Sequence, residues 1–199
     1  MPNSAPYEVI LTAPYTLYRA PVGTAFPDVA AAVSTVPAWV KVGANGPLNY
    51  DRDSGVTIEH RQAVFNWRSL GDAGVRKQAR TEADQILRIV LIDLTPEQYA
   101  LGLNDNPVRT VGGNTVIGLS YGFQMSTYAL LVRGDISPLG PAGHMQYEVP
   151  VVSNQGSSVV SFKTGAAAGI TLEWMSLVDA SASRPDEYFG RLVIEGVPS

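Results

Sequence analysis

The stretch 81–103 joins a strand-like run directly to a marked helix start, and the rest of the chain is organised around it. Residues 86–94 are rich in Ile, Val and Leu, and they are too apolar on both faces to be left in water. Thr95 then offers an N-cap, followed by proline at the first helical position and glutamine at the third. So short a helix would not persist alone. The pattern predicts a strand that passes without a loop into a helix over 96–103, docked on the sheet.

A proline-free span lies between Pro47 and Pro96, although the chain contains 14 prolines. This span holds two long strand candidates, 55–68 and 81–94, joined by a loop over 69–80. At about 3.3 Å per residue, each strand would reach about 43 to 46 Å. A compact domain of this length has a radius of gyration of about 16 Å. The sequence therefore predicts a hairpin that spans the body or protrudes from it, with long edges at which another subunit can join.

The other strand candidates are short and are separated by glycine, proline and serine, as is typical of a sandwich or barrel. We predict a mainly β chain: a β-sandwich or barrel with one short α-helix packed on it and a long protruding β-hairpin, in a single domain over 1–199. An N-terminal arm (1–6), a helical turn near 28–33 and a polar loop over 104–113 complete the prediction. The candidate strands lie at 7–12, 15–19, 39–42, 115–120, 127–133, 145–152, 159–162, 170–178 and 188–195.

The composition is that of an ordinary globular chain, with 45% hydrophobic and 16% charged residues among 199. The absence of cysteine excludes disulfides and thiolate metal sites. A net charge of −4 argues against tight binding of phosphates, but not against a surface past which DNA slides. The first residues show no signal peptide, and no apolar run approaches a membrane span, so we expect no membrane partner.

The charge is unevenly distributed. Residues 61–80 hold five basic side chains and one acid, a net charge of +4 that leaves −8 for the remainder. This segment is either a solvated loop or a basic projection that meets an acidic face on another copy. In the second case, changing both Arg76 and Lys77 to Glu would block assembly. The candidate contact residues on the projection are Arg68, Leu70, Arg76, Lys77 and Arg80. The acidic candidates are Asp51, Asp53, Glu173, Asp186 and Glu187.

One motif suggests an enzyme. Residues 118–122 read Gly-Leu-Ser-Tyr-Gly and match the nucleophile elbow, with Asp135 and His144 following Ser120 in the chain order of α/β-hydrolases. The elbow needs a helix after the serine, whereas 123–133 reads as a turn and a strand. The span from the serine to the histidine is also too short for the intervening βα units. A turn at a strand end is the favoured interpretation, and we expect no enzymatic activity.

Other motifs are incomplete. Residues 163–165 (Lys-Thr-Gly) lack the Ser-x-x-Lys that accompanies them in β-lactamases, and 133–135 (Arg-Gly-Asp) are most simply a turn. Residues 49–53 carry the alternating oxygen ligands of a calcium loop, but glycine and glutamate are missing further along the loop. His60 and His144 alone make a structural zinc site improbable. We predict no catalytic, cofactor-binding or metal-binding residue.

A series of short segments covers the chain from about residue 20 to 195 and is informative by its order. The segments are PVGTAFP (21–27), WVKVG (39–43), VTI (56–58), RSLG (68–71), RTE (80–82), DLTPEQY (93–99), YALLVR (128–133), MQYEVP (145–150) and FGRLV (189–193). In this combination, the chain resembles the tail tube (major tail) proteins of long-tailed bacteriophages.

The resemblance implies a β-sandwich or barrel with one helix, six copies closing into a ring, and rings stacking into a hollow tube that conducts the genome. The hairpin would line or knit that tube, with the loop 69–79 and the two terminal arms reaching neighbouring subunits. The implied partners are other copies of the chain, the tape measure, terminator and baseplate proteins, and DNA passing without specific binding. The implied location is the virion tail, after assembly in the host cytoplasm.

Two alternatives stay open. The chain could form a tail terminator or connector ring. A protein of another class would be a β-sandwich carbohydrate-binding or hydrolytic domain, which predicts an exposed aromatic platform or a working Ser120. In that case Ser120→Ala would abolish activity, whereas it would change nothing in a tube protein.

Overall fold

The computed structural model describes residues 15–71, 73–134, 144–156, 158–162, 164 and 168–195. The predicted fold class is confirmed, because the chain is mainly β and sandwich-like, and its described part has one α-helix, α1 (Pro96–Gly102). Short 3-10 turns cover Val33–Thr35, Gly46–Asn49 and Pro185–Glu187. The strands are β1 (Thr16–Ala20), β2 (Val40–Lys41), β3 (Val56–Trp67), β4 (Lys77–Leu91), β5 (Val108–Val111), β6 (Asn114–Ile117), β7 (Thr127–Gly134), β8 (Met145–Asn154), β9 (Val160–Ser161), β10 (Gly169–Ser176) and β11 (Arg191–Ile194).

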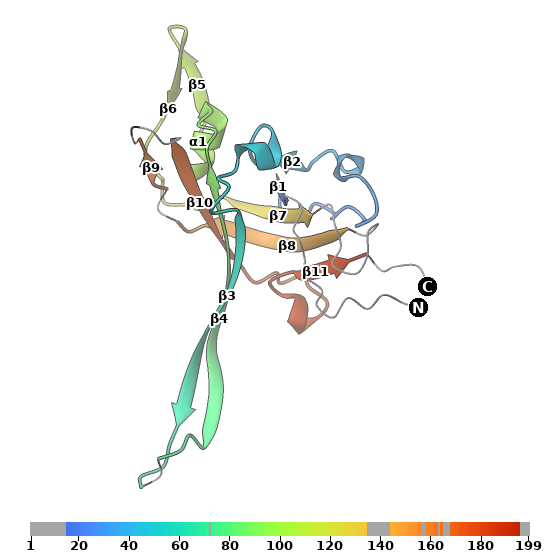
Figure 1. Ribbon diagram of the computed structural model, residues 1–199, viewed down its shortest axis with the longest axis vertical. Coiled ribbons are helices and arrows are strands. Elements are labelled where there is room, and N and C mark those ends of the chain that lie inside the picture. Colours follow the sequence, from blue (N-terminus) through green and yellow to red (C-terminus); the bar gives the residue numbers. More distant parts are fainter. Residues whose placement is uncertain are drawn as a thin grey trace.

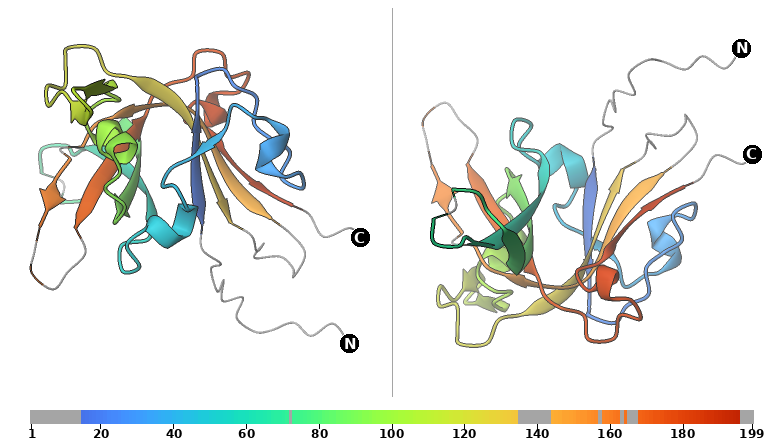
Figure 2. Two further views of the ribbon diagram at one scale, coloured as in Figure 1. Left: turned by 90° about the horizontal axis from the view of Figure 1, so that it is seen from above. Right: turned by 90° about the horizontal axis from the view of Figure 1, so that it is seen from below.

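Nine of these strands form one antiparallel sheet in the order β2-β1-β7-β8-β10-β4-β3, with β11 beside β8 and β9 beside β10. The remaining two, β5 and β6, form a separate hairpin next to α1 (Figure 1). Seen along the long axis of the molecule, the sheet is curved, and α1 lies at the side formed by β10 and β4 (Figure 2). The body is therefore a folded sheet with small elements packed against it.

The core lies on both faces of the sheet at β7. Leu130 and Val132 point into the main hydrophobic cluster, which also takes residues from β4, β8, β10 and α1. Ala129 and Leu131 point the other way, into a second cluster with Trp39. Trp39, from the predicted strand 39–42, is 6% exposed. A strand that is apolar on both faces, as β7 is, belongs in the middle of a sheet that is covered on both sides.

The helix α1 begins as its sequence predicts. The backbone N–H of Gln98 donates to Oγ1 of Thr95 at 3.4 Å, so Thr95 is the N-cap. The helix packs so closely on β10 that a Cβ atom on Gly102 would lie 2.5 Å from Cδ1 of Ile170. The expected direct passage from strand to helix is wrong, because β4 ends at Leu91 and residues 92–95 separate it from α1.

The long hairpin is formed by β3 and β4, which have 12 and 15 residues and pair from Val56 with Ile89 to Trp67 with Lys77. A β-bulge interrupts the register after Ala63. On the other side of β4, β10 pairs only with the end nearest the body, so the rest of the hairpin protrudes from the body (Figure 1).

Two predicted loops are wrong in part. The loop expected over 69–80 is shorter, because residues 77–80 belong to β4 and pair with β3. The polar loop expected over 104–113 contains β5, which pairs with β6 across Gly112 and Gly113. Both glycines have positive φ values, 57° and 82°, as a two-residue hairpin turn requires. This Gly-Gly pair was a hairpin signal in the sequence.

The other predicted strands are found with shifted ends. The last one begins at Arg191 rather than near 188, because the 3-10 turn Pro185–Glu187 precedes it. The helical turn expected near 28–33 lies at Val33–Thr35. The strand expected at 7–12 and the N-terminal arm 1–6 lie outside the described residues.

Candidate inter-subunit surfaces

The outer part of the hairpin is a ribbon of two strands, which we call the arm (60–85). Residues 77–85 of β4 pair with β3 alone, and β3 is itself the edge strand of the sheet, so the ribbon is open along both edges. At about 3.3 Å per residue, these residues of β4 extend about 30 Å beyond the last one that pairs with β10. Unpaired N–H and C=O groups along such an edge are a template for pairing with another chain.

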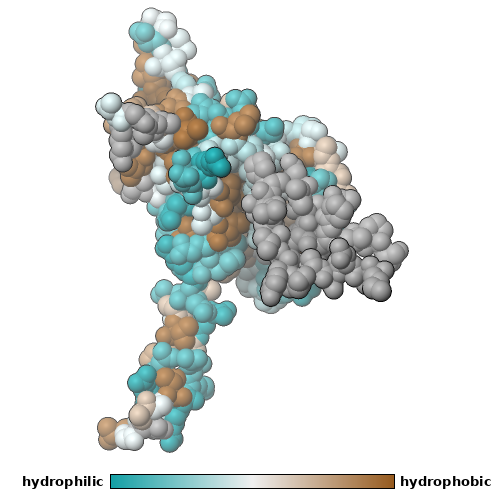
Figure 3. Space-filling view, in the orientation of Figure 1, coloured by the Kyte–Doolittle hydropathy of each residue, from teal (hydrophilic) through white to brown (hydrophobic). Residues whose placement is uncertain are grey.

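The arm carries exposed apolar side chains. Phe65 and Trp67, which are 57% and 48% exposed, lie on one face of β3, opposite Ala79 and Lys77 of β4. These four residues line a nearly apolar groove with a volume of about 440 Å³. Leu70, near the tip, is fully exposed, and apolar residues recur along the arm among hydrophilic ones (Figure 3). The arm therefore has a surface that another protein segment can cover.

The basic residues predicted to make contacts also lie on the arm. Arg68 directly follows β3, whereas Lys77 and Arg80 belong to β4. Nε of Arg80 donates to Oε1 of Gln62 at 3.0 Å, and the backbone N–H of Arg76 closes the hairpin by donating to β3. The structure thus brings together all the residues predicted for the projection, and all of them are exposed.

The predicted acidic partners are partly paired within the chain. Oε2 of Glu173 on β10 accepts a 2.7 Å hydrogen bond from Nε of Arg88 on β4. Oδ2 of Asp186 lies 2.8 Å from Nη2 of Arg184, and this guanidinium lowers the pKa of the Asp186 carboxyl group. Glu187 lies 3.9 Å from the same arginine. A basic residue of another copy would have to compete with these internal pairs.

The remaining acidic candidates follow the second 3-10 turn. Asp51 accepts hydrogen bonds from the hydroxyl and the backbone N–H of Ser54, at 2.7 and 3.0 Å, and these bonds lower the pKa of Asp51. Asp53 is exposed. At the base of the arm, Arg80 and Asp186 line the same cavity of about 570 Å³, so two candidates of opposite charge are close to each other within one chain. The acidic candidates thus lie in three separate places: before β3, on β10 and in the 3-10 turn Pro185–Glu187.

The body presents a second surface on the segment that joins β6 to β7, which we call the end loop (118–126). Two asparagines that follow α1 hold this loop in place. Nδ2 of Asn104 donates to the backbone oxygens of Tyr121 and Gln124, at 3.1 and 2.6 Å. Nδ2 of Asn106 donates to the backbone oxygens of Gly118 and Ser120, at 2.7 Å each. Asn104 has a φ of 60°, a left-handed conformation that asparagine tolerates. The loop is therefore fixed by the chain that leaves the helix.

The large side chains of the end loop point outward. This surface was missed in the sequence, where the alternation of apolar residues across 119–125 was the available signal. Exposed apolar groups that cluster on a body of this size mark a binding surface. The residues are Leu119, Tyr121, Phe123 and Met125, which are 70%, 45%, 109% and 55% exposed.

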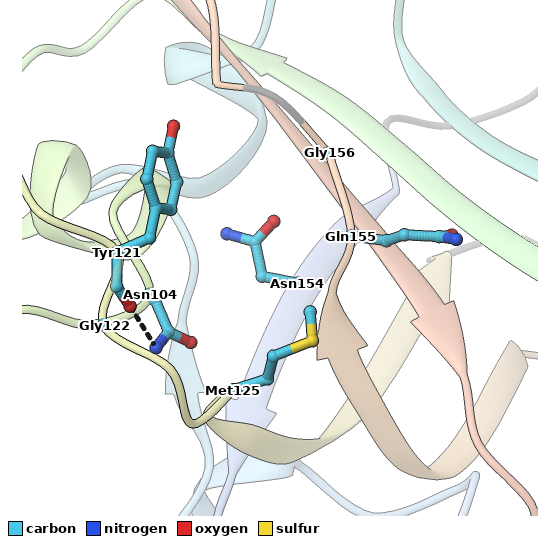
Figure 4. Close-up of a pocket in the computed structure, with 7 residues that line it drawn as sticks. All are labelled: Asn104, Tyr121, Gly122, Met125, Asn154, Gln155 and Gly156. Atoms are coloured by element: carbon cyan, nitrogen blue, oxygen red, sulfur yellow. Dashed lines mark hydrogen bonds between the residues drawn. The ribbon is translucent and has the colours of Figure 1, made fainter.

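A pocket of about 280 Å³ opens beside the end loop. Among the described residues, no charged side chain lines it. Asn154 is 7% exposed and donates through Nδ2 to the backbone oxygen of Leu101 at 2.9 Å, whereas its Oδ1 atom has no partner among the described residues. Its carboxamide lies between Tyr121 and Gly156 (Figure 4). The lining residues are Asn104, Tyr121, Gly122, Met125, Asn154, Gln155 and Gly156.

The end loop also contains the Gly-Leu-Ser-Tyr-Gly motif. Oγ of Ser120 accepts a 3.4 Å hydrogen bond from the backbone N–H of Gly122, and the chain continues into a turn and β7, as the sequence predicted. His144 directly precedes β8, at the end of the β7–β8 pair farthest from the end loop. With about 3.3 Å per residue, the length of β7 separates the two by about 23 Å. Asp135 lies outside the described residues.

The other incomplete motifs are accounted for by packing. Arg133 is 7% exposed and donates hydrogen bonds to the backbone oxygens of Ala31 and Val29, so its side chain is part of the body. In the calcium-like segment 49–53, Tyr50 is buried. Among the described residues, no three His, Cys, Asp or Glu side chains are grouped as a metal site would need.

A comparison with known proteins finds no family model that matches the chain and no curated protein that is significantly similar to it. In the part of the chain that the structure describes, the helix is too short and too polar to cross a membrane. The arm and the end loop are therefore the features from which a function can be inferred.

Proposed function

We propose that this chain is a structural protein of the bacteriophage virion, in which rings of six copies stack head to tail into the hollow tail tube through which DNA passes. The observation that carries the proposal is the arm. A ribbon of two strands is marginally stable in water on its own, and this one exposes both edges together with Phe65 and Trp67. A second copy that covers the arm would satisfy the edges and bury the aromatic rings.

The shape and charge of the molecule support the same proposal. The arm lies at one end of the long axis and the β5–β6 hairpin at the other (Figure 1). Contacts between two different ends of one molecule repeat without limit unless they close into a ring. The net charge of −4 also suits a conduit, because an acidic wall repels DNA instead of holding it. Tape measure, terminator and baseplate proteins are the further partners of such a tube.

Negative-stain imaging at rising protein concentration, combined with light scattering, tests the proposal. Six-fold rings or hollow tubes of regular repeat are the expected result. Rings that never stack would indicate a terminator or connector instead. A 21.2 kDa monomer at every concentration, also after addition of preformed tail tips, would contradict the proposal.

A carbohydrate-binding domain is the second candidate, and the end loop is the observation that favours it. Tyr121 and Phe123 are exposed aromatic residues beside a pocket lined by side-chain amides. Saccharide binding to the wild-type chain that is lost in Tyr121→Ala would support this candidate. Loss of a hydrolytic activity in Ser120→Ala would support its enzymatic form, whereas we expect Ser120→Ala to assemble normally.

A further inference from the structure

We propose that the Asn154 pocket binds an arginine guanidinium group from the arm of a second copy, and that Arg68 supplies it. This inference rests on the proposed function, because it names the surface at which one subunit receives the next along the tube. It also identifies the ligand of the pocket by chemical class.

The pocket has the chemistry that a guanidinium group needs. Oδ1 of Asn154 is a buried acceptor without a donor among the described residues, and such an atom is costly until it is paired. The amide of Asn104 is already used, since its Nδ2 donates to the end loop and its Oδ1 accepts a 2.6 Å bond from the backbone N–H of Ser126. A ligand must therefore bring donors for Asn154.

The ring of Tyr121, which lines the pocket, further restricts the chemical class of the ligand. A guanidinium group carries five N–H donors and no acceptor, and it stacks on aromatic rings. Tyr121 offers a ring beside Asn154, and the neutral lining sets no repulsive charge against a cation. A carboxylate would bring only acceptors to Oδ1 of Asn154. A lysine ammonium group would bring a compact, strongly hydrated charge that cannot lie flat against Tyr121.

Arg68 is placed to reach this pocket in a neighbour. It follows the last residue of β3, about 30 Å beyond the body, and it is exposed. The arm protrudes from the body, which carries the end loop between β6 and β7, so the arm tip can reach an end loop only in another copy (Figure 1). Trp67 and Leu70 flank Arg68 and would meet Leu119 and Phe123, which are also exposed.

The arm and the region of the end loop are complementary in charge as well. The arm (60–85) holds five basic and three acidic residues, a net charge of +2. The segment 92–126, which contains α1 and the end loop, holds three acids and one base, a net charge of −2. Opposite potentials steer encounter and fix orientation. Apolar contact, charge and the unpaired acceptor thus favour the same partner, a second copy of this chain.

Cysteine cross-linking tests the contact directly, because the chain has no cysteine of its own. Ser69→Cys and Phe123→Cys in one chain place thiols beside Arg68 and Tyr121 while keeping both residues. Under mild oxidation during assembly, we expect a ladder of covalent multimers. The matched control combines Arg52→Cys, on the body, with Phe123→Cys. Assembly into rings or tubes without a ladder, or with the same ladder in the control, would overturn the inference and leave the proposed function standing.

Variants in the pocket and on the arm test the chemistry. Arg68→Ala and Tyr121→Ala should each raise the concentration needed for assembly by about tenfold or more, and the double variant should be little worse than either. Arg52→Ala is the control and should assemble normally. Arg68→Lys keeps the charge but not the planar donors, so it should recover little. Normal assembly of Arg68→Lys would show that charge alone attracts the arm.

A ligand titration separates the pocket from assembly. If the wild-type chain stays monomeric, the proposed function fails, but N-acetylarginine amide can still be titrated into the monomer. We expect chemical shift changes in the side-chain amide of Asn154 that are absent with the lysine analogue and in Tyr121→Ala. Changes with maltose but not with the arginine amide would assign the pocket to a saccharide and overturn the inference.

Discussion

Two strands of this chain, β7 in the body and the outer part of β4 on the arm, are stabilised in different ways. Every residue of β7 except Thr127 is buried, and the strand has a partner on each side. On the arm, β4 residues 77–82 are all exposed and have one partner strand. The two strands therefore differ in the number of their partner strands and in the apolar area that they bury. The body contains the interactions that fold it, whereas the arm exposes groups that a partner can cover.

The largest expected effect comes from a matched pair of tryptophans. Trp174 on β10 is 1% exposed and Trp67 on the arm is 48% exposed. Trp174→Ala should lower the free energy of unfolding by about 3–5 kcal/mol, because it leaves a cavity in the core. Trp67→Ala should change the free energy of unfolding of the monomer by less than about 0.5 kcal/mol and weaken assembly instead. Urea unfolding and light scattering measure the two effects, and equal losses of stability would contradict the distinction.

The next largest effect on stability is expected from a comparison of two arginines. Arg133 is buried and donates to the backbone oxygens of Ala31 and Val29, whereas Arg80 is exposed and donates to Gln62. Arg133→Ala should cost about 2–3 kcal/mol of unfolding free energy, since it removes charged hydrogen bonds and leaves two partly buried acceptors unpaired. Arg80→Ala should cause no measurable change in thermal unfolding of the monomer. A melting temperature of Arg133→Ala equal to that of the wild type would refute this account.

Alkaline pH ionises tyrosines of the body, whereas the arm has no tyrosine. Burial raises the pKa of Tyr50 from 10.0 to about 12, and its hydroxyl donates to the backbone oxygen of Val42 and accepts from the N–H of Leu17. Because the folded pKa is the higher one, this contribution to stability is complete below pH 10 and is lost between pH 10 and 12. We expect a loss of about 1.4 kcal/mol per pH unit in that window.

Tyr50→Phe isolates this effect from the other titrating groups. The variant should be about 1–2 kcal/mol less stable at pH 7, because Leu17 and Val42 lose their buried partner. It should also lack the extra slope between pH 10 and 12. Denaturant unfolding of both chains at several pH values provides the comparison, and identical slopes would rule out Tyr50 as the cause.

The sequence predicted those elements that a local pattern determines. The apolar run in β4 predicted a strand, and the N-cap at Thr95 predicted a helix. The proline-free span between Pro47 and Pro96 predicted the hairpin. It could not give partners that depend on strand register, such as Arg88 for Glu173, because neighbouring strands are far apart in the chain. The end loop was not predicted for a similar reason. Its shape depends on Asn104, which has a left-handed backbone conformation and lies before the β5–β6 hairpin in the chain.

The smallest expected effect comes from two threonines and concerns local hydrogen bonds. Thr95 caps α1 in the body, whereas Thr81 sits at the bulge of the arm, where β3 pairs with residues on either side of it. Thr95→Ala should cost about 1 kcal/mol, because the N–H of Gln98 loses its acceptor. Thr81→Ala removes an exposed side chain that makes no cap, so the free energy of unfolding should stay the same within error. Should Thr81→Ala destabilise the monomer as much as Thr95→Ala, the arm would be contributing to the fold of the body, and its exposed face could no longer be explained by a missing partner alone.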